Sequence, residues 1–376
     1  MPGVLSGIRI LEFAGIGPAP FCGMMLADHG AEVIRISRLG AQDDLRDPLL
    51  RSRRSIALDL KHPNAKDVIF DLLKTSHGLI EGFRPGVMER LSLGPDEVLS
   101  AKSDFVYGRM TGWGQHGPYA HTAGHDINYI ALSGALHMVG REGQKPNPPA
   151  NLIGDFGGGG MMLAFGMVSA LLAVKNGQAG QVVDCAMTDG SATLSAAIWG
   201  LLARGLWKDE AGVNVLDGGA HFYDTYETKD GKWISIGSIE PQFYALLREK
   251  LGLFDDRAFD AQRDPSAWPA LRGKLTNIFL TKTRDEWCEI LEMTDVCFSP
   301  VLSMCEAPDH PHNVARNTFI SVNGITQPRP APVFSKEAYE PPVPPCEVGI
   351  HTQDVLAEIG YSDDVIEKLK EDGVSN

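Results

Sequence analysis

The chain has 376 residues, of which 43% are hydrophobic and 22% are charged. This balance is typical of a folded chain with two or three domains, and it excludes bulk disorder. The net charge of −14 argues against a general nucleic-acid-binding protein, because such proteins present a basic face.

The first part of the chain alternates between strand-like and helix-like segments. It begins with a β-rich run, a Gly/Pro loop, an apolar helix and a second strand, at residues 8–13, 14–20, 21–29 and 32–36. This order predicts a βαβ unit with parallel strands. Further strand-like runs follow at residues 55–60, 78–81, 105–110 and 181–186. The alternation predicts an α/β fold with a doubly wound parallel sheet.

The pattern changes after Asp189, where residues 191–207 are predicted to form one long helix that leaves the first core. The turn Lys229-Asp230-Gly231 between two strand-like runs is typical of a β-hairpin. Further helices are expected at residues 241–252, 271–280, 284–293 and 354–370, with a proline-rich surface crossing at residues 328–345. The segment that begins at the hairpin is therefore predicted to be a smaller α+β unit.

The termini, cysteines and apolar runs predict a cytoplasmic protein without a membrane partner. The N-terminus lacks the basic start and apolar run of a secretory signal peptide. The six cysteines are scattered without a C-x-x-C pair, which favours free thiols in a reducing compartment. Residues 161–174 and 192–203 are apolar but shorter than the roughly 20 residues of a membrane-spanning helix. We interpret them as buried helices.

The first loop contains only part of a dinucleotide-binding motif. Gly15 and Gly17 begin a G-x-G-x-x-G pattern whose third glycine is missing. About 20 residues further on, an NAD enzyme has an acidic residue that binds the ribose. This chain has Arg38 there, and a guanidinium suits a phosphorylated ribose.

A basic region surrounds Arg38. Residues 35–61 contain seven basic and four acidic side chains, and Arg84 and Arg90 follow a later strand. One interpretation is a set of surface arginines paired with Asp43, Asp44 and Asp47. The other is a site for an anionic, nucleotide-like ligand, and the patch does not separate NADP from coenzyme A.

Two short polar segments could supply proton chemistry. His125 is flanked by Asp126 and Asn128, side chains that can orient an imidazole. Asp155 precedes four glycines and an apolar helix. An aspartate at a helix start can be only an N-cap. Four glycines exceed what a cap needs, however, and their N–H groups could closely approach an anionic oxygen such as that of an enolate.

Other catalytic classes have less support. His116, His121 and His125 lie five and four residues apart in a loop-rich segment, so they do not share one helical face and no metal site is expected. The G-x-S-x-G motif of a serine nucleophile is absent from the sequence. Cys22 and Cys185 stand in apolar surroundings suited to packing.

Four segments carry specific motifs, namely residues 14–18, 123–129, 154–159 and 239–244. Together, and in matching order, they resemble the racemases of the family III CoA-transferase superfamily that act on α-methylacyl-CoA thioesters. The likeness runs from Leu5 to about Phe334. Its most specific parts are His-Asp-Ile-Asn-Tyr at residues 125–129 and Gly-Asp-Phe-Gly-Gly at residues 154–158.

The resemblance implies a large Rossmann-like domain, a smaller α+β domain and an interlocked homodimer of two threaded chains. Residues 1–186 would form the N-terminal part of the large domain, residues 187–222 a helical linker and residues 223–308 the small domain. Residues 309–376 would provide a return linker and the C-terminal part of the large domain. The active site would lie between the large domain of one chain and the small domain of its partner.

The resemblance also implies roles for individual residues. His125 and Asp155 would be the catalytic acid–base pair, and the partner's Glu240 would pair with His125. The CoA portion would be held by Arg38, Leu58, Asp59, Leu60, Lys61, Gly82, Phe83, Arg84 and Arg90. The thioester would be surrounded by Gly124, Asp126, Ile127, Asn128 and Tyr129. No metal or separate cofactor would be required, because coenzyme A is part of the substrate.

The implied activity is that of an isomerase in lipid and fatty acid metabolism. It would interconvert (2R)- and (2S)-methylacyl-CoA by a 1,1-proton transfer through an enolate. The main alternative is a family III CoA-transferase in which Asp155 attacks the thioester, although such enzymes generally carry glutamine where this chain has Ile16. A non-catalytic acyl-CoA sensor and an NADP dehydrogenase are the remaining alternatives.

Overall fold

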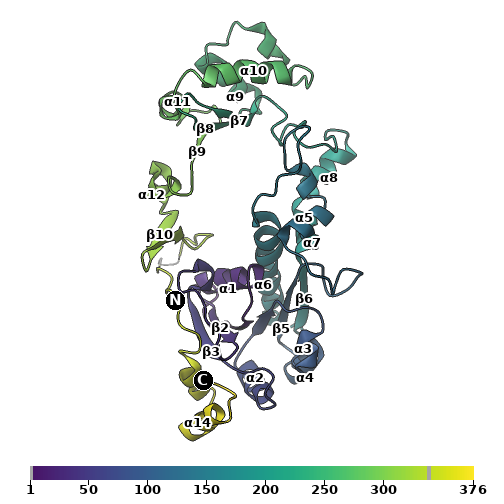
Figure 1. The fold of residues 1–376 in the computed structure, drawn as a ribbon, viewed down its shortest axis with the longest axis vertical. Coiled ribbons are helices and arrows are strands. Elements are labelled where there is room, and N and C mark those ends of the chain that lie inside the picture. The colour runs from purple at the N-terminus through teal and green to yellow at the C-terminus, as the bar shows by residue number, and fades with distance from the viewer. Residues whose placement is uncertain (1–2, 337–339) are drawn as a thin grey trace. The chain divides into compact units, whose positions relative to one another are not determined.

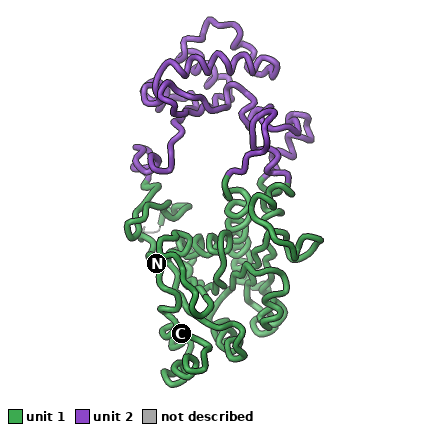
Figure 2. Tube along the Cα trace, in the orientation of Figure 1, with its two compact units in different colours: residues 1–133, 150–194, 317–376 green, residues 134–149, 195–316 purple. Residues whose placement is uncertain are grey.

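The structure of the protein is a computed structural model, which describes residues 3–336 and 340–376 (Figure 1). The chain divides into two compact units, coloured separately in Figure 2. Unit 1 consists of residues 1–133, 150–194 and 317–376, and unit 2 of residues 134–149 and 195–316. Each unit therefore combines segments that are far apart in the sequence.

Unit 1 is built on a parallel sheet of six strands. They are β1 (Arg9–Phe13), β2 (Glu32–Ser37), β3 (Arg53–Ala57), β4 (Gly78–Glu81), β5 (Val106–Thr111) and β6 (Gln181–Ala186). Their order is β3-β2-β1-β4-β5-β6, and neighbouring strands are parallel. The predicted α/β fold with a doubly wound parallel sheet is confirmed. The strand order reverses between β1 and β4, and such a switch point opens a crevice at the carboxyl ends of the strands.

Helices cover both faces of this sheet (Figure 1). α1 (Pro18–Asp28) and α6 (Met162–Lys175) pack on the face that includes Ile10. The opposite face includes Leu11 and is covered by α2 (Ala65–Lys74), α3 (Val87–Arg90), α4 (Pro95–Ala101), α13 (Thr352–Glu358) and α14 (Asp363–Glu371). Successive side chains of β1 therefore enter different apolar layers, which explains its nearly continuous apolar sequence.

Two helices that the sequence predicts as continuous are broken in the structure. The one expected at residues 191–207 is instead α7 (Met187–Leu194) followed by α8 (Ala196–Ala203). The one expected at residues 354–370 is α13 and α14, and Gly360 lies between them with a φ of 99°. The expectation that residues 192–203 are buried is also wrong for α8, which has no buried residue in the single chain.

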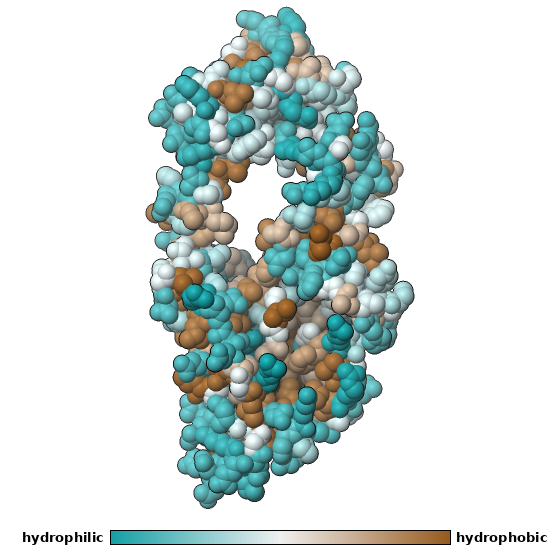
Figure 3. Space-filling view, in the orientation of Figure 1, coloured by the Kyte–Doolittle hydropathy of each residue, from teal (hydrophilic) through white to brown (hydrophobic). Residues whose placement is uncertain are grey.

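The longest apolar helix is partly exposed. A π-helix, Leu152–Met161, continues directly into α6, and together they form Leu152–Lys175. Among the described residues, this is the one helix that is long and apolar enough to cross a membrane, judged by length and composition alone. Phe165 is 72% and Leu172 57% exposed, so the helix predicted to be buried at residues 161–174 is buried on only part of its surface. Figure 3 shows hydrophobic side chains, in brown, among hydrophilic ones on the face in view.

Unit 2 contains a small antiparallel sheet and its own core. The sheet has the order β7 (Tyr223–Glu227), β8 (Trp233–Gly237) and β9 (Phe298–Val301). The core is completed by α9 (Pro241–Lys250), α10 (Trp268–Phe279) and α11 (Arg284–Leu291). The predicted hairpin at Asp230-Gly231 and the three predicted helices are confirmed. β9 was missed because it has only four residues and contains a proline.

The remaining elements are short. They are α5 (Asp126–Leu132), α12 (Pro311–Arg316), the hairpin of β10 (Phe319–Val322) and β11 (Ile325–Pro328), and the 3₁₀ helices Pro48–Leu50, Leu136–Met138, Arg257–Ala261 and Ala307–Asp309. The proline-rich crossing predicted at residues 328–345 includes residues 337–339, which lie outside the described residues.

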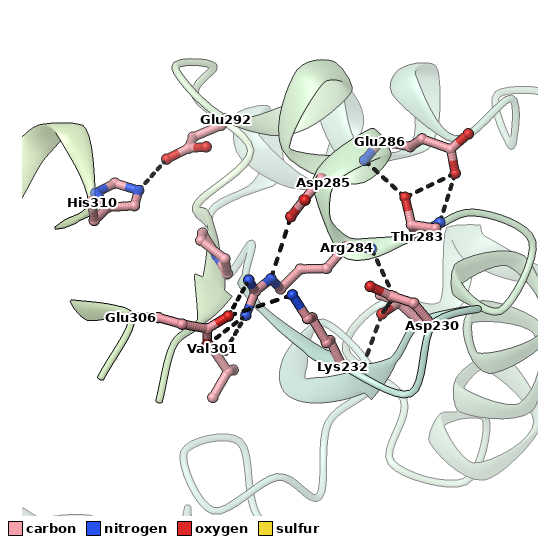
Figure 4. Close-up of polar contacts among 12 residues, drawn as sticks. Asp230, Lys232, Thr283, Arg284, Asp285, Glu286, Glu292, Val301, Glu306 and His310 are labelled. Carbon is pink, nitrogen blue, oxygen red and sulfur yellow. Dashed lines mark hydrogen bonds and ion pairs between the residues drawn. The ribbon is translucent and has the colours of Figure 1, made fainter. Parts of the chain in front are cut away.

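A network of ion pairs around Arg284 fixes the segment after β9 to the hairpin of unit 2 (Figure 4). The Arg284 guanidinium donates to both carboxylate oxygens of Glu306, at 2.8 and 3.1 Å, and to the carbonyl of Val301. Its backbone N–H donates to Asp230 in the β7–β8 turn. This guanidinium, with hydrogen bonds from Ser303, holds the pKa of Glu306 well below its usual range. The bidentate pair with Glu306 and the backbone hydrogen bond to Asp230 together connect three segments of unit 2.

Candidate active site

Unit 1 contains a cavity of about 490 Å³ at the carboxyl ends of β1, β4 and β5. Its walls come from the loop at residues 14–19, from residues 82–85 after β4 and from residues 110–113 at the end of β5. The segment that leads to α5, together with Asp155 and Met187, completes the wall. The cavity therefore lies at the switch point of the sheet, where α/β proteins bind ligands.

His125 and Asp155 line this one cavity from different elements. His125 is exposed and directly precedes α5, and its backbone N–H donates to Oδ1 of Asn128 at 3.0 Å. Asp155 is half-buried in the first turn of the π-helix. Its Oδ2 accepts a hydrogen bond from Nδ2 of Asn151 at 3.1 Å. An imidazole and a carboxylate are thus available to the same ligand.

The pKa of Asp155 is raised above its ordinary value. Burial of the carboxylate is the main cause, and the negative charge of Asp126 acts in the same direction. The hydrogen bond from Asn151 and the nearby His125 lower the pKa but do not offset the increase. A carboxyl group shifted this way holds a proton more readily at neutral pH, which acid–base catalysis requires.

Glycine is required at position 17, beside Asp155. The φ of Gly17 is 66°, in the left-handed region, and a Cβ at this position would lie 3.3 Å from Oδ2 of Asp155. A side chain there would therefore be strained and would crowd the carboxylate. The second glycine of the G-x-G start therefore permits this close approach to Asp155.

The four glycines after Asp155 have a different function from the predicted one. Gly158, Gly159 and Gly160 are buried, and none of the four lines the cavity. A Cβ on Gly158 would lie 2.6 Å from the Ser191 backbone nitrogen, and one on Gly160 would lie 2.6 Å from the Pro18 carbonyl oxygen. They allow the π-helix to pack closely on α7 and α1. The alternative that Asp155 is an N-cap is also wrong, because Asn151 holds that position.

Aromatic side chains support the segment that carries His125. The ring of Tyr129 packs edge-to-face on Trp113 with centroids 4.8 Å apart, and its hydroxyl donates to the carbonyl of Gly124. A Cβ on Gly112 or Gly124 would collide with the Tyr129 ring. Burial raises the pKa of Tyr129, and the charge of Asp155 adds to the effect. The sequence analysis missed Trp113, although its place just after a predicted strand was a usable signal.

Most of the basic region is occupied by ion pairs. Glu12 is fully buried and binds Arg35 at 2.5 Å and Arg53 at 3.0 Å. The remaining pairs are Arg35–Asp43, Arg46–Asp44, Arg51–Asp28, Arg54–Glu32 and Arg54–Glu358. Five of the seven basic residues are thus paired, but only Arg35 and Arg46 have a predicted partner. Glu12, Asp28, Glu32 and Glu358 were not among the predicted partners, and Arg35, Arg51 and Arg53 are buried rather than at the surface.

The other cations stand at the carboxyl edge of the sheet. Arg38 follows β2, Lys61 lies four residues after β3, and Arg84 and Arg90 follow β4. All four side chains are exposed, and among the described residues none has an ion-pair partner within 4.0 Å. Only Arg84 of the four lines the cavity.

The other predicted CoA contacts occupy the same edge. Leu58 is fully buried in the core, so only its backbone can face a ligand. Asp59 and Leu60 are half-buried in the turn after β3. Gly82 and Phe83 line the cavity after β4, and the Phe83 N–H donates to Glu81 at 2.7 Å.

The predicted thioester contacts divide into two groups. Gly124, His125 and Tyr129 line the cavity, whereas Asp126, Ile127 and Asn128 do not. Asp126 is 6% exposed, and its Oδ1 accepts the backbone N–H of Asp155. Asn128 orients the backbone of His125, and Ile127 is 44% exposed.

Glu240 stands in unit 2, whereas the cavity lies in unit 1. It occupies the N-cap position of α9 and is exposed. Its pairing with His125 stays a prediction.

Comparison with known proteins gives the context of this site. The model of the family described as CoA-transferase family III matches residues 5–352. The α-methylacyl-CoA racemases of Mus musculus and Homo sapiens are 46% and 43% identical to the chain, covering 99% and 98% of it and 97% of each relative. A crystal structure of a CAIB/BAIF family protein from Brucella suis, 22% identical, superposes with a TM-score of 0.82 over 96% of this chain and 100% of that one. The chain belongs to CoA-transferase family III.

Proposed function

We propose that the protein is a racemase of 2-methylacyl-CoA thioesters, with His125 and Asp155 as its two acid–base groups. The observation that carries the proposal is that this imidazole and this carboxylate line one cavity at the switch point of the sheet. The two racemases at 46% and 43% identity support the substrate class.

The reaction moves a proton at the carbon next to the thioester carbonyl. That C–H bond is weakly acidic, so one group must remove the proton and another must return one from the opposite face. With the pKa of Asp155 raised by burial, its carboxyl group can act as acid in one direction and as base in the other. His125 performs the complementary step, and the roles exchange with the configuration of the substrate.

The CoA portion is held along the carboxyl edge of the sheet. Arg38, Lys61, Arg84 and Arg90 are the exposed cations on this edge and would bind the phosphates, since guanidinium and ammonium groups pair strongly with phosphate. The backbone of residues 58–61 and the loop at residues 82–84 would contact the rest of the nucleotide. No metal or separate cofactor takes part in this proposal.

The active enzyme is an interlocked homodimer in this proposal. Residues 1–186 and 309–376 form the large domain, residues 187–222 the linker and residues 223–308 the small domain. Large apolar side chains left uncovered in the single chain support a second copy, since such surface is normally buried. They include Met161, Phe165, Leu172, Leu194 and Trp199, which are 50–72% exposed. The partner's Glu240 would orient His125, and the enzyme would act in cytoplasmic lipid and fatty acid metabolism.

Isotope exchange tests this function. A single enantiomer of a 2-methylacyl-CoA ester incubated with the protein in D₂O should lose optical purity and gain one deuterium at Cα. The competing CoA-transferase activity predicts transfer of CoA to an added carboxylic acid, without deuterium in the recovered ester. Stable optical purity together with CoA transfer would replace the racemase by the transferase.

A further inference from the structure

The C-terminal part of the chain covers the open edge of the sheet. β3 is an edge strand, and residues 349–352 lie along its free side. The His351 N–H donates to the Ser55 carbonyl at 3.0 Å, and the Ser55 N–H donates to Nδ1 of His351 at 3.1 Å. The hydroxyl oxygen of Thr352 accepts the Ala57 N–H at 3.1 Å. These bonds satisfy edge groups that would otherwise face solvent.

The last three residues extend this contact beyond β3. Gly373 reverses the chain after α14 with a φ of 73°. The carbonyl of Val374 then accepts the Asp59 N–H at 2.9 Å, and Ser375 forms an antiparallel bridge with Leu58. Val374 is fully buried and Ser375 is 4% exposed. Specific contacts with residues 58 and 59 therefore hold this segment.

Asn376 ties this segment to the edge of β3. Its Oδ1 accepts a hydrogen bond from the Thr352 hydroxyl at 2.5 Å, and its Nδ2 donates to the carbonyl of Gly349 at 3.2 Å. Gly349 has a φ of 81°, and a Cβ there would lie 2.3 Å from Nδ2 of Asn376. Val374, Ser375 and Asn376 therefore form a fitted C-terminal clamp.

The clamp holds one particular turn, residues 58–61. Within it, the Asp59 carboxylate accepts the Lys61 N–H at 3.0 Å, and the Leu58 N–H donates to the carbonyl of Ser37, the residue before Arg38. The clamp thus fixes the backbone of the turn that carries Lys61 and that is hydrogen-bonded to the residue before Arg38; both cations are exposed. Both cations stand where the proposed function puts the phosphates of CoA.

We propose that the C-terminal clamp is a positioning element for the CoA nucleotide. This inference rests on the proposed function, because it takes residues 58–61 as part of the CoA site. Without the clamp, the Asp59 N–H loses its acceptor and the turn becomes more mobile. Binding must then order the turn, and this conformational entropy weakens the affinity for the nucleotide. The acid–base groups lie on other elements and are unaffected.

Two variants test the clamp. Asn376→Ala removes the side-chain tether. Deletion of residues 374–376 also removes the bridge to Leu58 and the carbonyl that accepts the Asp59 N–H. Glu371→Ala is the matched control, since Glu371 is exposed at the end of α14, the helix that directly precedes the clamp, and is not part of the clamp. The dissociation constant of free CoA should rise about 5- to 10-fold in both clamp variants, as expected for one or two lost hydrogen bonds, and stay constant in the control. Racemisation of a 2-methylacyl-pantetheine thioester, which lacks the nucleotide, should not change.

The outcomes separate this inference from the function on which it rests. If the unmodified protein does not bind CoA, the proposed function fails. If it binds CoA and both variants bind CoA equally well, the clamp has no positioning role. If the variants lose activity equally toward the CoA and pantetheine esters, the segment only stabilises the fold and the inference is overturned. Asn376→Ala changes one exposed side chain, so a folded protein is available for each comparison.

Discussion

The backbone N–H of Asp155 donates a 2.8 Å hydrogen bond to Oδ1 of Asp126. Asp126 is the residue next to His125 in the chain, so one carboxylate connects the two proposed acid–base groups. The adjacent Gly154 admits no side chain, because its Cβ would lie 2.3 Å from the same oxygen. The other oxygen of Asp126 is buried and has no hydrogen-bond partner among the described residues. Asp126 is therefore both an anchor for Asp155 and a source of its raised pKa.

Two neighbours of Asp155 should shift the pH dependence of racemisation in opposite directions. The charge of Asp126 raises the pKa of Asp155, so Asp126→Asn should move the acid limb of the pH–rate profile to lower pH. The hydrogen bond from Asn151 lowers this pKa, so Asn151→Ala should move the same limb to higher pH. The profile of kcat for the substrate configuration deprotonated by Asp155 measures both. Shifts of the same sign would contradict this account of the site.

Substitution of either acid–base group should nearly abolish racemisation. His125→Gln and Asp155→Asn should each lower kcat about 10²- to 10⁴-fold, the range typical of general acid–base groups. Deuterium incorporation from D₂O gives the rate, and calorimetric titration with CoA should show unchanged affinity. His121→Ala is the control, because His121 is exposed in the same segment but does not line the cavity. Full activity in His125→Gln would remove the imidazole from the mechanism.

Arg38 should distinguish CoA from its dephosphorylated form. If its guanidinium binds the ribose phosphate, Arg38→Ala should weaken CoA binding about 10-fold or more and leave 3′-dephospho-CoA binding nearly constant. Calorimetry with both ligands measures the difference. Arg46→Ala is the matched control, since Arg46 is exposed but already paired with Asp44 at 3.0 Å. Equal losses for both ligands would place Arg38 away from the ribose phosphate.

His221 should make the stability of unit 2 depend on pH. It is fully buried, its Nε2 lies 2.7 Å from the Tyr244 hydroxyl oxygen, and burial lowers its pKa from 6.5 to about 4, with a further contribution from Arg272. The unfolded state therefore binds the proton more tightly than the folded state. The contribution of neutral His221 to the free energy of unfolding is complete above pH 6.5. It is lost as the pH falls toward 4, by about 3 kcal/mol at most.

Urea unfolding followed by tryptophan fluorescence at pH 7 and pH 5 measures this effect. The free energy of unfolding should fall between these two pH values in the unmodified protein. It should fall less in His221→Gln, which cannot titrate. An equal decrease in both proteins would assign the pH dependence to other groups.

The sequence predicted the elements of unit 1 well because their signals are local. β4 and β6 match the predicted runs at residues 78–81 and 181–186, since short apolar strands bounded by turns are distinct. The segments around His125 and Asp155 were found for a similar reason, and the structure brings both to one cavity. The expectation that Arg38 stands past the second strand also follows from local order.

What the sequence could not provide depends on contacts between distant residues. Glu12 binds Arg35 and Arg53 only because β1, β2 and β3 are neighbours in the sheet. The glycines after Asp155 were assigned to a ligand because the closeness of α1 and α7 is invisible in the local sequence. The break between α7 and α8 was missed because only Ser195 separates the two helices, and no proline or glycine marks the boundary.

The close packing behind Asp155 limits which parts of the site can adapt. Buried glycines let the backbone of the π-helix pack directly against α1 and α7. The helix that carries the Asp155 carboxylate therefore has no room to shift sideways. The imidazole of His125 is exposed and is not enclosed by such packing. When a ligand of inverted configuration arrives, adjustment must therefore come from the bound molecule or the imidazole, while the aspartate serves as the fixed reference point.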